Sequence, residues 1–144
     1  MAHIDVVPVE PGTEEAWHQP PFSGVRSDGF LWGRGAVDDK CAVIGIFEGI
    51  EALLAEGFVP SRTVYVSIGH DEEIGGGEGA KSVAALLTDR GVHLEFVLDE
   101  GGAIATDLLP GVTEPVALLG IGEKGYLNVE LVAEEDGGHS SVPP

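Results

Sequence analysis

Acidic and histidine side chains gather in four short stretches of this sequence. The stretches are residues 3–5 (His-Ile-Asp), 38–39 (Asp-Asp), 71–73 (Asp-Glu-Glu) and 99–100 (Asp-Glu). Neutral imidazole and carboxylate are ligands that zinc takes in hydrolases, where one carboxylate can bridge two ions and another can deprotonate a bound water. Each stretch alone has an ordinary explanation, such as helix capping or a solvated turn. Together, and in this order, they indicate a metal-dependent hydrolytic site.

These stretches need regular elements to position them. The sequences of residues 1–7, 63–68 and 94–98 are rich in apolar and β-branched residues and predict strands, the latter two followed directly by the acids. Apolar residues at helical spacing predict one helix over 38–56 and a second over 79–90, each closed by a glycine. Ligands gather beyond the carboxyl ends of parallel strands, so we expect the acidic stretches to converge on one site.

The remaining segments complete the predicted fold. Residues 9–28 are rich in proline and acidic side chains and predict a loop, and residues 29–34 a short strand or hairpin. Residues 116–121 and 126–134 predict two further strands. Because strands alternate with helices, we predict an α/β fold with a mostly parallel sheet flanked by helices.

The composition excludes several classes of partner. The 144 residues include 25 acidic and 7 basic side chains, a net charge of −18. Such a surface repels phosphate backbones, so nucleic acids and anionic membranes are unfavourable partners. There is no apolar run long enough to cross a membrane, and the single cysteine, Cys41, cannot form an internal disulfide. The sequence leaves the compartment open, with the cytoplasm favoured.

Six stretches of this sequence resemble a known enzyme family. They read HIDVVP, PPFSG, DGFLWGRGAVDDK, GHDEEIGG, LDEGG and GGHSSVPP. The chain resembles the zinc-dependent carboxypeptidases and amidohydrolases that include carboxypeptidase S, aminoacylase, glutamate carboxypeptidase and the N-fatty-acyl-amino-acid hydrolases. The resemblance spans essentially the whole chain, its motif set is highly specific, and the last two stretches most resemble the carboxypeptidase S branch.

The resemblance implies a fold, a reaction and a set of residue roles. It implies a catalytic domain of the co-catalytic zinc exopeptidase type, with two Zn²⁺ ions per intact site, that cleaves the amide bond of peptides or N-acyl amino acids. By resemblance, His3 and Asp99 bind the first zinc, Asp38 bridges both ions, and Glu73 binds the second on the far side of Asp38. Glu72 is then the general base that takes a proton from the metal-bound water.

Two further residues and one peptide bond receive roles from the same resemblance. Asp5 holds the imidazole of His3 in place without binding the metal itself. His139 matches a lid-domain histidine that reaches the partner subunit's active site and stabilises the oxyanion, so the intact parent is expected to be homodimeric. The Asp38–Asp39 peptide bond is expected to be cis, as is common after the bridging aspartate of this family.

The resemblance also implies a domain division. Residues 1–122 match the central part of the zinc-binding catalytic domain, and residues 123–144 match the start of the lid and dimerisation domain. The family's second zinc takes a further histidine from near the C-terminus, which does not occur here, and the family normally places other elements before the first strand. We therefore expect a chain truncated at both ends.

Two alternatives follow from other readings of the same residues. The first is a catalytically inactive fragment or binding piece of such an enzyme, because the C-terminal zinc ligand is absent. The second is a calcium-stabilised acidic domain, although the chain lacks the spaced Asp/Asn-Gly loop pattern of calcium motifs and His3 suits calcium poorly. Metal analysis separates the three: zinc near two per chain supports the hydrolase, zinc near one or none the fragment, and calcium the third.

Overall fold

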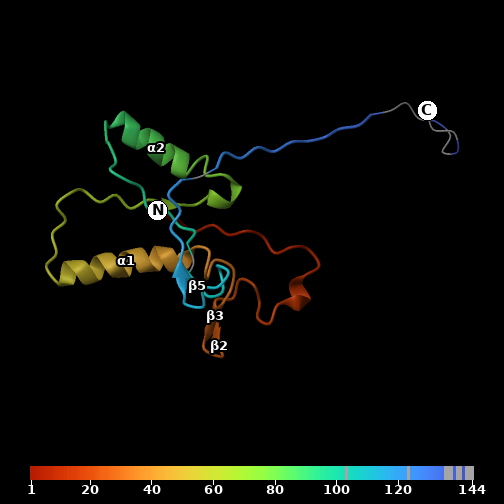
Figure 1. Ribbon diagram of the computed structural model, residues 1–144, viewed down its shortest axis with the longest axis horizontal. Helices are drawn as coiled ribbons and strands as arrows, with labels where there is room; N and C mark the ends of the chain where they lie inside the picture. The colour runs from red at the N-terminus through yellow and green to blue at the C-terminus, as the bar shows by residue number, and fades with distance from the viewer. Residues whose placement is uncertain (103, 123, 135–137, 139–140, 142–144) are drawn as a thin grey trace. The chain divides into compact units, whose positions relative to one another are not determined.

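The computed structural model describes residues 1–102, 104–122, 124–134, 138 and 141. The chain divides into two compact units, Met1–Gly101 and Gly102–Pro144 (Figure 1). The domain boundary that we expect after residue 122 stays a prediction. In the described residues, no helix combines the length and the apolar character that a membrane span requires.

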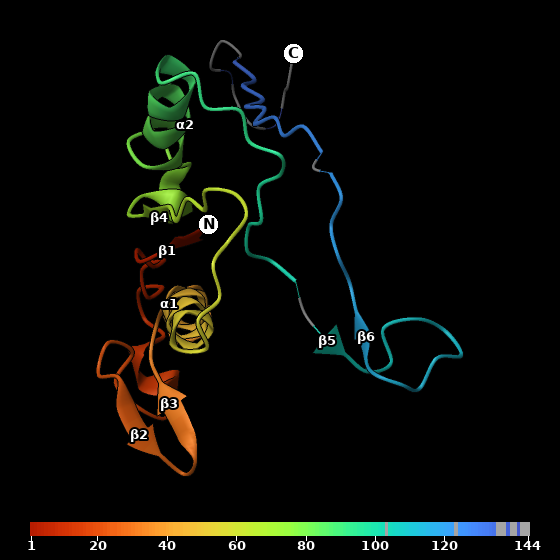
Figure 2. The same ribbon diagram turned by 90° about the vertical axis from the view of Figure 1, so that its left-hand side faces the viewer.

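A short parallel ladder lies at the centre of the first unit. Strand β1 (Ala2–His3) pairs in parallel with β4 (Ile68–Gly69), with Ala2 opposite Ile68 and His3 opposite Gly69. Figure 2 shows the two strands between helices α1 and α2. Ala2 and His3 are both buried, with 5% and 1% of their surfaces exposed. His3 is therefore fixed in the most buried part of the first unit.

Strand β1 is shorter than the strand that we expect over residues 1–7. The ladder ends when the Ile4 amide donates to the Gly69 carbonyl at 3.0 Å. Beyond it, the Val7 amide donates to a carboxylate oxygen of Glu73 at 3.1 Å instead of to a neighbouring strand. The prediction was wrong for residues 4–7 because the ladder ends at the Ile4 amide, and the Val7 amide bonds to a side chain instead of a strand.

Helix α1 (Lys40–Ala55) matches the predicted helix over 38–56 to within two residues. It ends where the Gly57 amide donates to Leu54 and the Phe58 amide to Leu53, the paired bonds of a Schellman motif. Gly57 has a φ of 78°, which glycine adopts without strain. The predicted glycine stop is confirmed.

The start of α1 is tied to β1 and to the preceding loop. The Lys40 amide donates to the Gly35 carbonyl at 3.0 Å, and the Lys40 ammonium donates to the Ile4 carbonyl at 2.7 Å. The amide of His3 donates to a carboxylate oxygen of Asp39 at 3.3 Å. These bonds fix the residues at the start of α1 relative to the histidine on β1.

Helix α2 (Ala80–Asp89) matches the predicted helix over 79–90 and ends in the same manner as α1. The Gly91 amide donates to Thr88, and the Val92 amide donates to Leu87 at 2.9 Å. A second glycine stop, with φ of 66° at Gly91, is confirmed.

A hairpin occupies part of the segment that we expect to be loop. Strand β2 (Val25–Ser27) pairs antiparallel with β3 (Phe30–Trp32). The two residues between them, Asp28 and Gly29, have φ values of 54° and 82°, which the type I′ turns of tight hairpins require. The expected hairpin over 29–34 is therefore present, but it begins at Val25, inside the predicted loop, which also holds the 3₁₀ turn η1 (Glu14–Ala16).

The other predicted strands are much shorter or absent. Only Ile68 of the segment 63–68 lies in a strand, residues 94–98 form none, and 126–134 form none among those described. In the second unit, β5 (Ile104–Ala105) pairs antiparallel with β6 (Val116–Ala117), the start of the predicted strand 116–121. A β-rich sequence favours extended backbone, but a strand also requires a partner ladder. The fold is α/β with short parallel and antiparallel sheets.

Candidate metal centre

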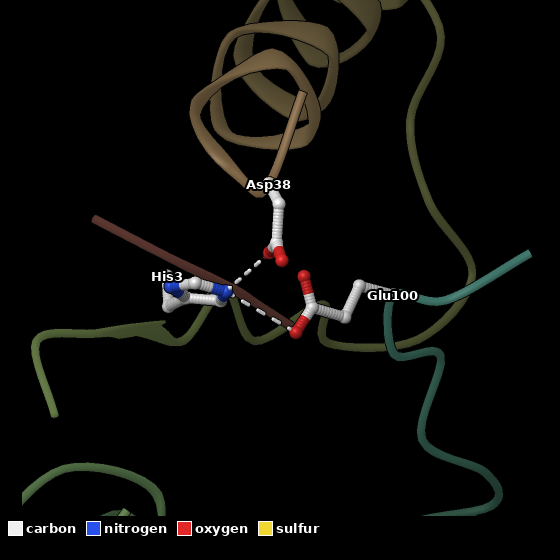
Figure 3. Close-up of side chains that lie close together, drawn as sticks. All are labelled: His3, Asp38 and Glu100. Atoms are coloured by element: carbon white, nitrogen blue, oxygen red, sulfur yellow. Dashed lines mark hydrogen bonds and ion pairs between the residues drawn. The ribbon is translucent and has the colours of Figure 1, made fainter. Parts of the chain in front are cut away.

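Three side chains from separate parts of the first unit converge on one point (Figure 3). The His3 Nε2 atom lies 2.9 Å from a carboxylate oxygen of Asp38 and 3.3 Å from one of Glu100. One ligand atom from each of the three residues lies within 4.8 Å of the other two. Two atoms that each bind a zinc ion at about 2 Å are at most about 4 Å apart. The three ligand atoms are therefore almost as close together as the ligand atoms of a metal site.

The structure brings Glu100, and not Asp99, to His3 and Asp38. Glu100 is half-buried, whereas Asp99 is exposed and belongs to no metal-sized group of the described residues. Adjacent residues on extended backbone point in opposite directions, so only one of the pair can face the histidine. The structure therefore adds Glu100 as a candidate beside Asp99, whose role as a metal ligand stays a prediction, and nothing in the Asp-Glu pair itself indicates which of the two faces inward.

The 3₁₀ turn η2 (Glu72–Ile74) directs two adjacent glutamates differently. A carboxylate oxygen of Glu72 lies 3.7 Å from His3 Nε2, at the edge of the three-residue group. Glu73 instead accepts the Val7 amide at 3.1 Å and lines a cavity together with Asp38. Glu72 thus lies beside His3, whereas Glu73 lies in the wall of the cavity with Asp38.

Asp5 orients the imidazole of His3. One Asp5 carboxylate oxygen lies 3.3 Å from His3 Nδ1, and its backbone carbonyl lies 3.2 Å from the same nitrogen. The other carboxylate oxygen accepts the Glu73 amide at 3.0 Å. Because Asp5 contacts the Nδ1 atom, the Nε2 atom faces the acidic side chains. Metal-binding histidines are commonly held in this way by a second residue.

Asp71 fixes the loop that carries the two glutamates, a role that the sequence did not suggest. Its carboxylate accepts the amides of Glu78 at 2.6 Å and Gly79 at 2.9 Å, and its backbone carbonyl accepts the amides of Ile74 and Gly76. Only 7% of its surface is exposed. A Cβ atom at Gly79 would lie 2.3 Å from the Asp71 carboxylate, so glycine is required at that position.

Asp39 is a second functional residue that the sequence left unassigned. It is 4% exposed and accepts the His3 amide, which braces the backbone on which Asp38 lies. The Asp38–Asp39 peptide bond is cis, as expected. The two aspartates contact different parts of His3: Asp38 contacts its imidazole, and Asp39 accepts its backbone amide.

The electrostatics of the group favour a bound cation. Burial, a hydrogen bond with Asp39 and the charge of Asp39 raise the pKa of Glu100 to about 7. Burial also raises the pKa of Glu72, helped by the nearby carboxylates. Burial lowers the pKa of His3, but the hydrogen bond that its ring donates to Asp38 and the charges of Glu100 and Glu72 outweigh burial and raise the pKa overall. The carboxylates therefore repel one another and favour positive charge between them, which a divalent cation bound to the neutral imidazole would supply in place of a proton.

Asp5 behaves differently from the other acids. Burial raises its pKa, but the backbone amides of Glu73 and Glu72 outweigh burial and lower it overall. Asp5 is therefore kept as a carboxylate beside the imidazole. The remaining expected site residue, His139, lies outside the described residues.

Comparison with known proteins gives a consistent family assignment. The family model described as peptidase family M20/M25/M40 matches residues 1–140. The N-fatty-acyl-amino acid synthase/hydrolase of Xenopus tropicalis is 49% identical over 144 residues, which are 100% of this chain and 28% of that protein. Its human counterpart is 46% identical over the same 100% and 28%. Carboxypeptidase S of Saccharomyces cerevisiae is 45% identical over 152 residues, covering 100% of this chain and 25% of its own length.

The chain thus spans about a quarter of the length of the curated relatives that it matches, which carry the names of hydrolases and carboxypeptidases. The residues matched by the family model include His3, Asp38 and Glu100, which converge in the structure, and Glu72 at the edge of that group. On the evidence of its sequence along nearly its whole length, the chain belongs to peptidase family M20/M25/M40.

Proposed function

We propose that this chain forms the metal-binding part of a two-zinc hydrolase that cleaves the amide bond of peptides or N-acyl amino acids. The observation that carries the proposal is the convergence of His3, Asp38 and Glu100, with Glu72 at its edge. One imidazole and several carboxylates are a donor set that zinc accepts, and no lysine or arginine forms an ion pair with these acids among the described residues. The relatives' names supply the reaction class.

The chain's residues divide the two metal positions between them. His3 and Glu100 would hold the first ion, Glu73 would hold the second, and Asp38 would be shared between them. Glu100 thus takes the role that the sequence assigned to its neighbour Asp99. When bound, zinc supplies a Lewis acid and lowers the pKa of a coordinated water to about 7.

Glu72 acts as the general base and then as the acid. It lies at the edge of the group without a hydrogen bond of its own among the described residues, and burial raises its pKa towards the range in which proton transfer is efficient. It therefore takes a proton from the attacking water and returns it to the leaving amine. Asp5 keeps the imidazole oriented while this occurs.

The substrate class follows from the relatives. One is named for synthesis and hydrolysis of N-fatty-acyl amino acids and another as a carboxypeptidase. Both reactions make or break an amide beside an amino acid carboxylate. The same relationship supports a homodimeric parent in which His139 serves the partner subunit's site, an extended parallel sheet flanked by helices, and a lid domain that begins near residue 123.

The test compares two adjacent glutamates in the protein at its natural length. Glu72→Gln should lower turnover of an N-acyl amino acid by about 10²- to 10⁴-fold, because a general base contributes about that much, while zinc content stays near wild type. Glu73→Ala should lower zinc content instead. Retained turnover in Glu72→Gln would remove this residue from the role of base.

A further inference from the structure

A cavity of about 170 Å³ lies on the Glu73 side of Asp38 and has both of these acids in its wall. One water needs about 10–15 Å³ of such space, so the cavity admits a small organic group. Its wall otherwise consists of apolar side chains, two glycines and a single cation, Arg34. The remaining lining residues are Val6, Val7, Trp17, Gly33, Gly35 and Val37.

Arg34 has no acidic partner in the described part of the chain. It forms no ion pair there, although the sequence holds 25 acidic residues against 7 basic ones. One terminal nitrogen donates to the Pro8 carbonyl at 3.3 Å, a long bond, and the buried Nε atom has no acceptor. Buried donors are normally satisfied, and a guanidinium prefers a carboxylate. Among the described residues, the side chain therefore lacks the carboxylate partner for which its geometry is suited.

The guanidinium is nevertheless held in place. Its central carbon lies 5.0 Å from the centre of the Trp17 ring, within the range of a cation–π contact. The Arg34 backbone amide donates to the Pro21 carbonyl at 2.7 Å. A Cβ atom at Gly35 would lie 2.7 Å from Val6 and 2.5 Å from Lys40. The absence of a side chain at Gly35 therefore allows the residues of the cavity wall to pack closely. An arginine fixed in this way can recognise an anion with little loss of side-chain freedom.

We propose that this cavity is a carboxylate subsite, in which Arg34 binds the carboxylate of a small ligand while Trp17 and the valines contact its aliphatic part. The identity of that ligand as substrate or product rests on the proposed function. Asp38 and Glu73 repel an anion unless cations neutralise them, so occupancy requires the metal-loaded protein. Two parallel N–H···O bonds from the guanidinium explain why a carboxylate, rather than a neutral amide, is selected.

The test uses the zinc-loaded protein at its natural length, with butyrate as the probe and butyramide as its neutral match. Binding is measured from the shift of the thermal unfolding midpoint. Arg34→Gln should weaken butyrate binding roughly 10- to 100-fold, as expected for charge-assisted hydrogen bonds, and Arg34→Lys should restore part of it. Arg26→Gln is the control, because Arg26 is exposed on β2 and its loss changes the net charge equally. Butyramide binding should not respond to any of these changes.

Two outcomes support the subsite and identify its ligand. Weaker butyrate binding with a higher KM for an N-acyl amino acid in Arg34→Gln assigns the cavity to the substrate's own carboxylate. Weaker butyrate binding with an unchanged KM assigns it to a carboxylate product. Equal butyrate binding in wild type and Arg34→Gln, or an equal loss in Arg26→Gln, overturns the subsite.

A structural role for Arg34 gives a different result. In that case Arg34→Gln lowers zinc content or the unfolding midpoint before butyrate is added, it weakens butyramide binding as much as butyrate binding, and the subsite is overturned. The butyrate measurement needs no turnover. A wild-type protein without amide hydrolysis therefore refutes the proposed function, while the subsite is still decided by the binding data.

Discussion

Replacing Glu100 by glutamine should have opposite effects on the zinc-loaded and the metal-free protein. The pKa of Glu100 is raised from 4.5 to about 7, a difference of about 2.5 that corresponds to at most about 3 kcal/mol at 1.36 kcal/mol per pH unit. A carboxyl group whose pKa is raised by folding weakens the folded state above pH 7, where the group is charged. This loss disappears as the pH falls through 7 towards 4.5.

Glutamine avoids that cost because it carries no charge. The metal-free Glu100→Gln protein should therefore be more stable than metal-free wild type near pH 8, by up to about 3 kcal/mol, and the difference should vanish near pH 4.5. The glutamine amide can also donate to Asp39, as the protonated Glu100 does. With zinc bound the order reverses, because a charged ligand is lost. Affinity for zinc should fall by at least about 100-fold, the upper end of the effect of outer-shell partners.

The assay is unfolding of wild type, Glu100→Gln and Asp99→Asn, each with and without zinc, near pH 8 and pH 5. Asp99→Asn is the matched control. It removes the same negative charge at the neighbouring position, from a side chain that is exposed. It should change neither zinc content nor the pH dependence. Zinc loss in Asp99→Asn with normal zinc in Glu100→Gln would refute the placement of Glu100 and restore Asp99 as the ligand.

Three further predictions concern the residues around the metal group. Asp71→Asn should destabilise the protein by about 1–3 kcal/mol, seen as a lower unfolding midpoint, because the backbone amide of either Glu78 or Gly79 loses its acceptor; an unchanged midpoint contradicts this. Gly79→Ala should lower turnover and stability, since the new Cβ atom meets Asp71, whereas Gly77→Ala, with open space around it, should be neutral in the same assays. Asp5→Asn should weaken zinc binding about 10- to 100-fold in a competition titration, and unaltered affinity would show that the imidazole does not depend on this carboxylate.

The parts of the fold that sequence patterns predicted are those determined locally. Helices α1 and α2 were predicted to within two residues because apolar spacing and a following glycine define both ends. The Asp28–Gly29 turn is an equally local signal for a hairpin, although the hairpin begins before the predicted segment. Strands depend on partners distant in sequence. The segments 63–67 and 94–98 have strand-like composition but no ladder, and composition alone does not reveal that.

The same distinction applies to the candidate site. His3 and Asp38 could be chosen by the order of motifs along the chain, and the structure brings them to 2.9 Å. The choice between Asp99 and Glu100 depends on the direction of one side chain at the end of an extended segment, which no motif encodes. The roles of Asp39 and Asp71 depend on backbone amides, which are invisible in a pattern of side chains.

The bonds between β1 and the start of α1 have a consequence for how the intervening segment can change. His3, Ile4, Asp39 and Lys40 hold the two ends of this segment together through the His3 amide and the Lys40 ammonium. For a flexible loop with fixed ends, doubling its length costs only about 0.6 kcal/mol of closure entropy. The exposed turn at residues 10–12 can therefore accept an inserted peptide, while Trp17, which lies in the cavity wall, remains where it is. The distance from His3 to Asp38 should be insensitive to such an insertion. This makes the segment a suitable position for a reporter or an affinity tag in the intact enzyme.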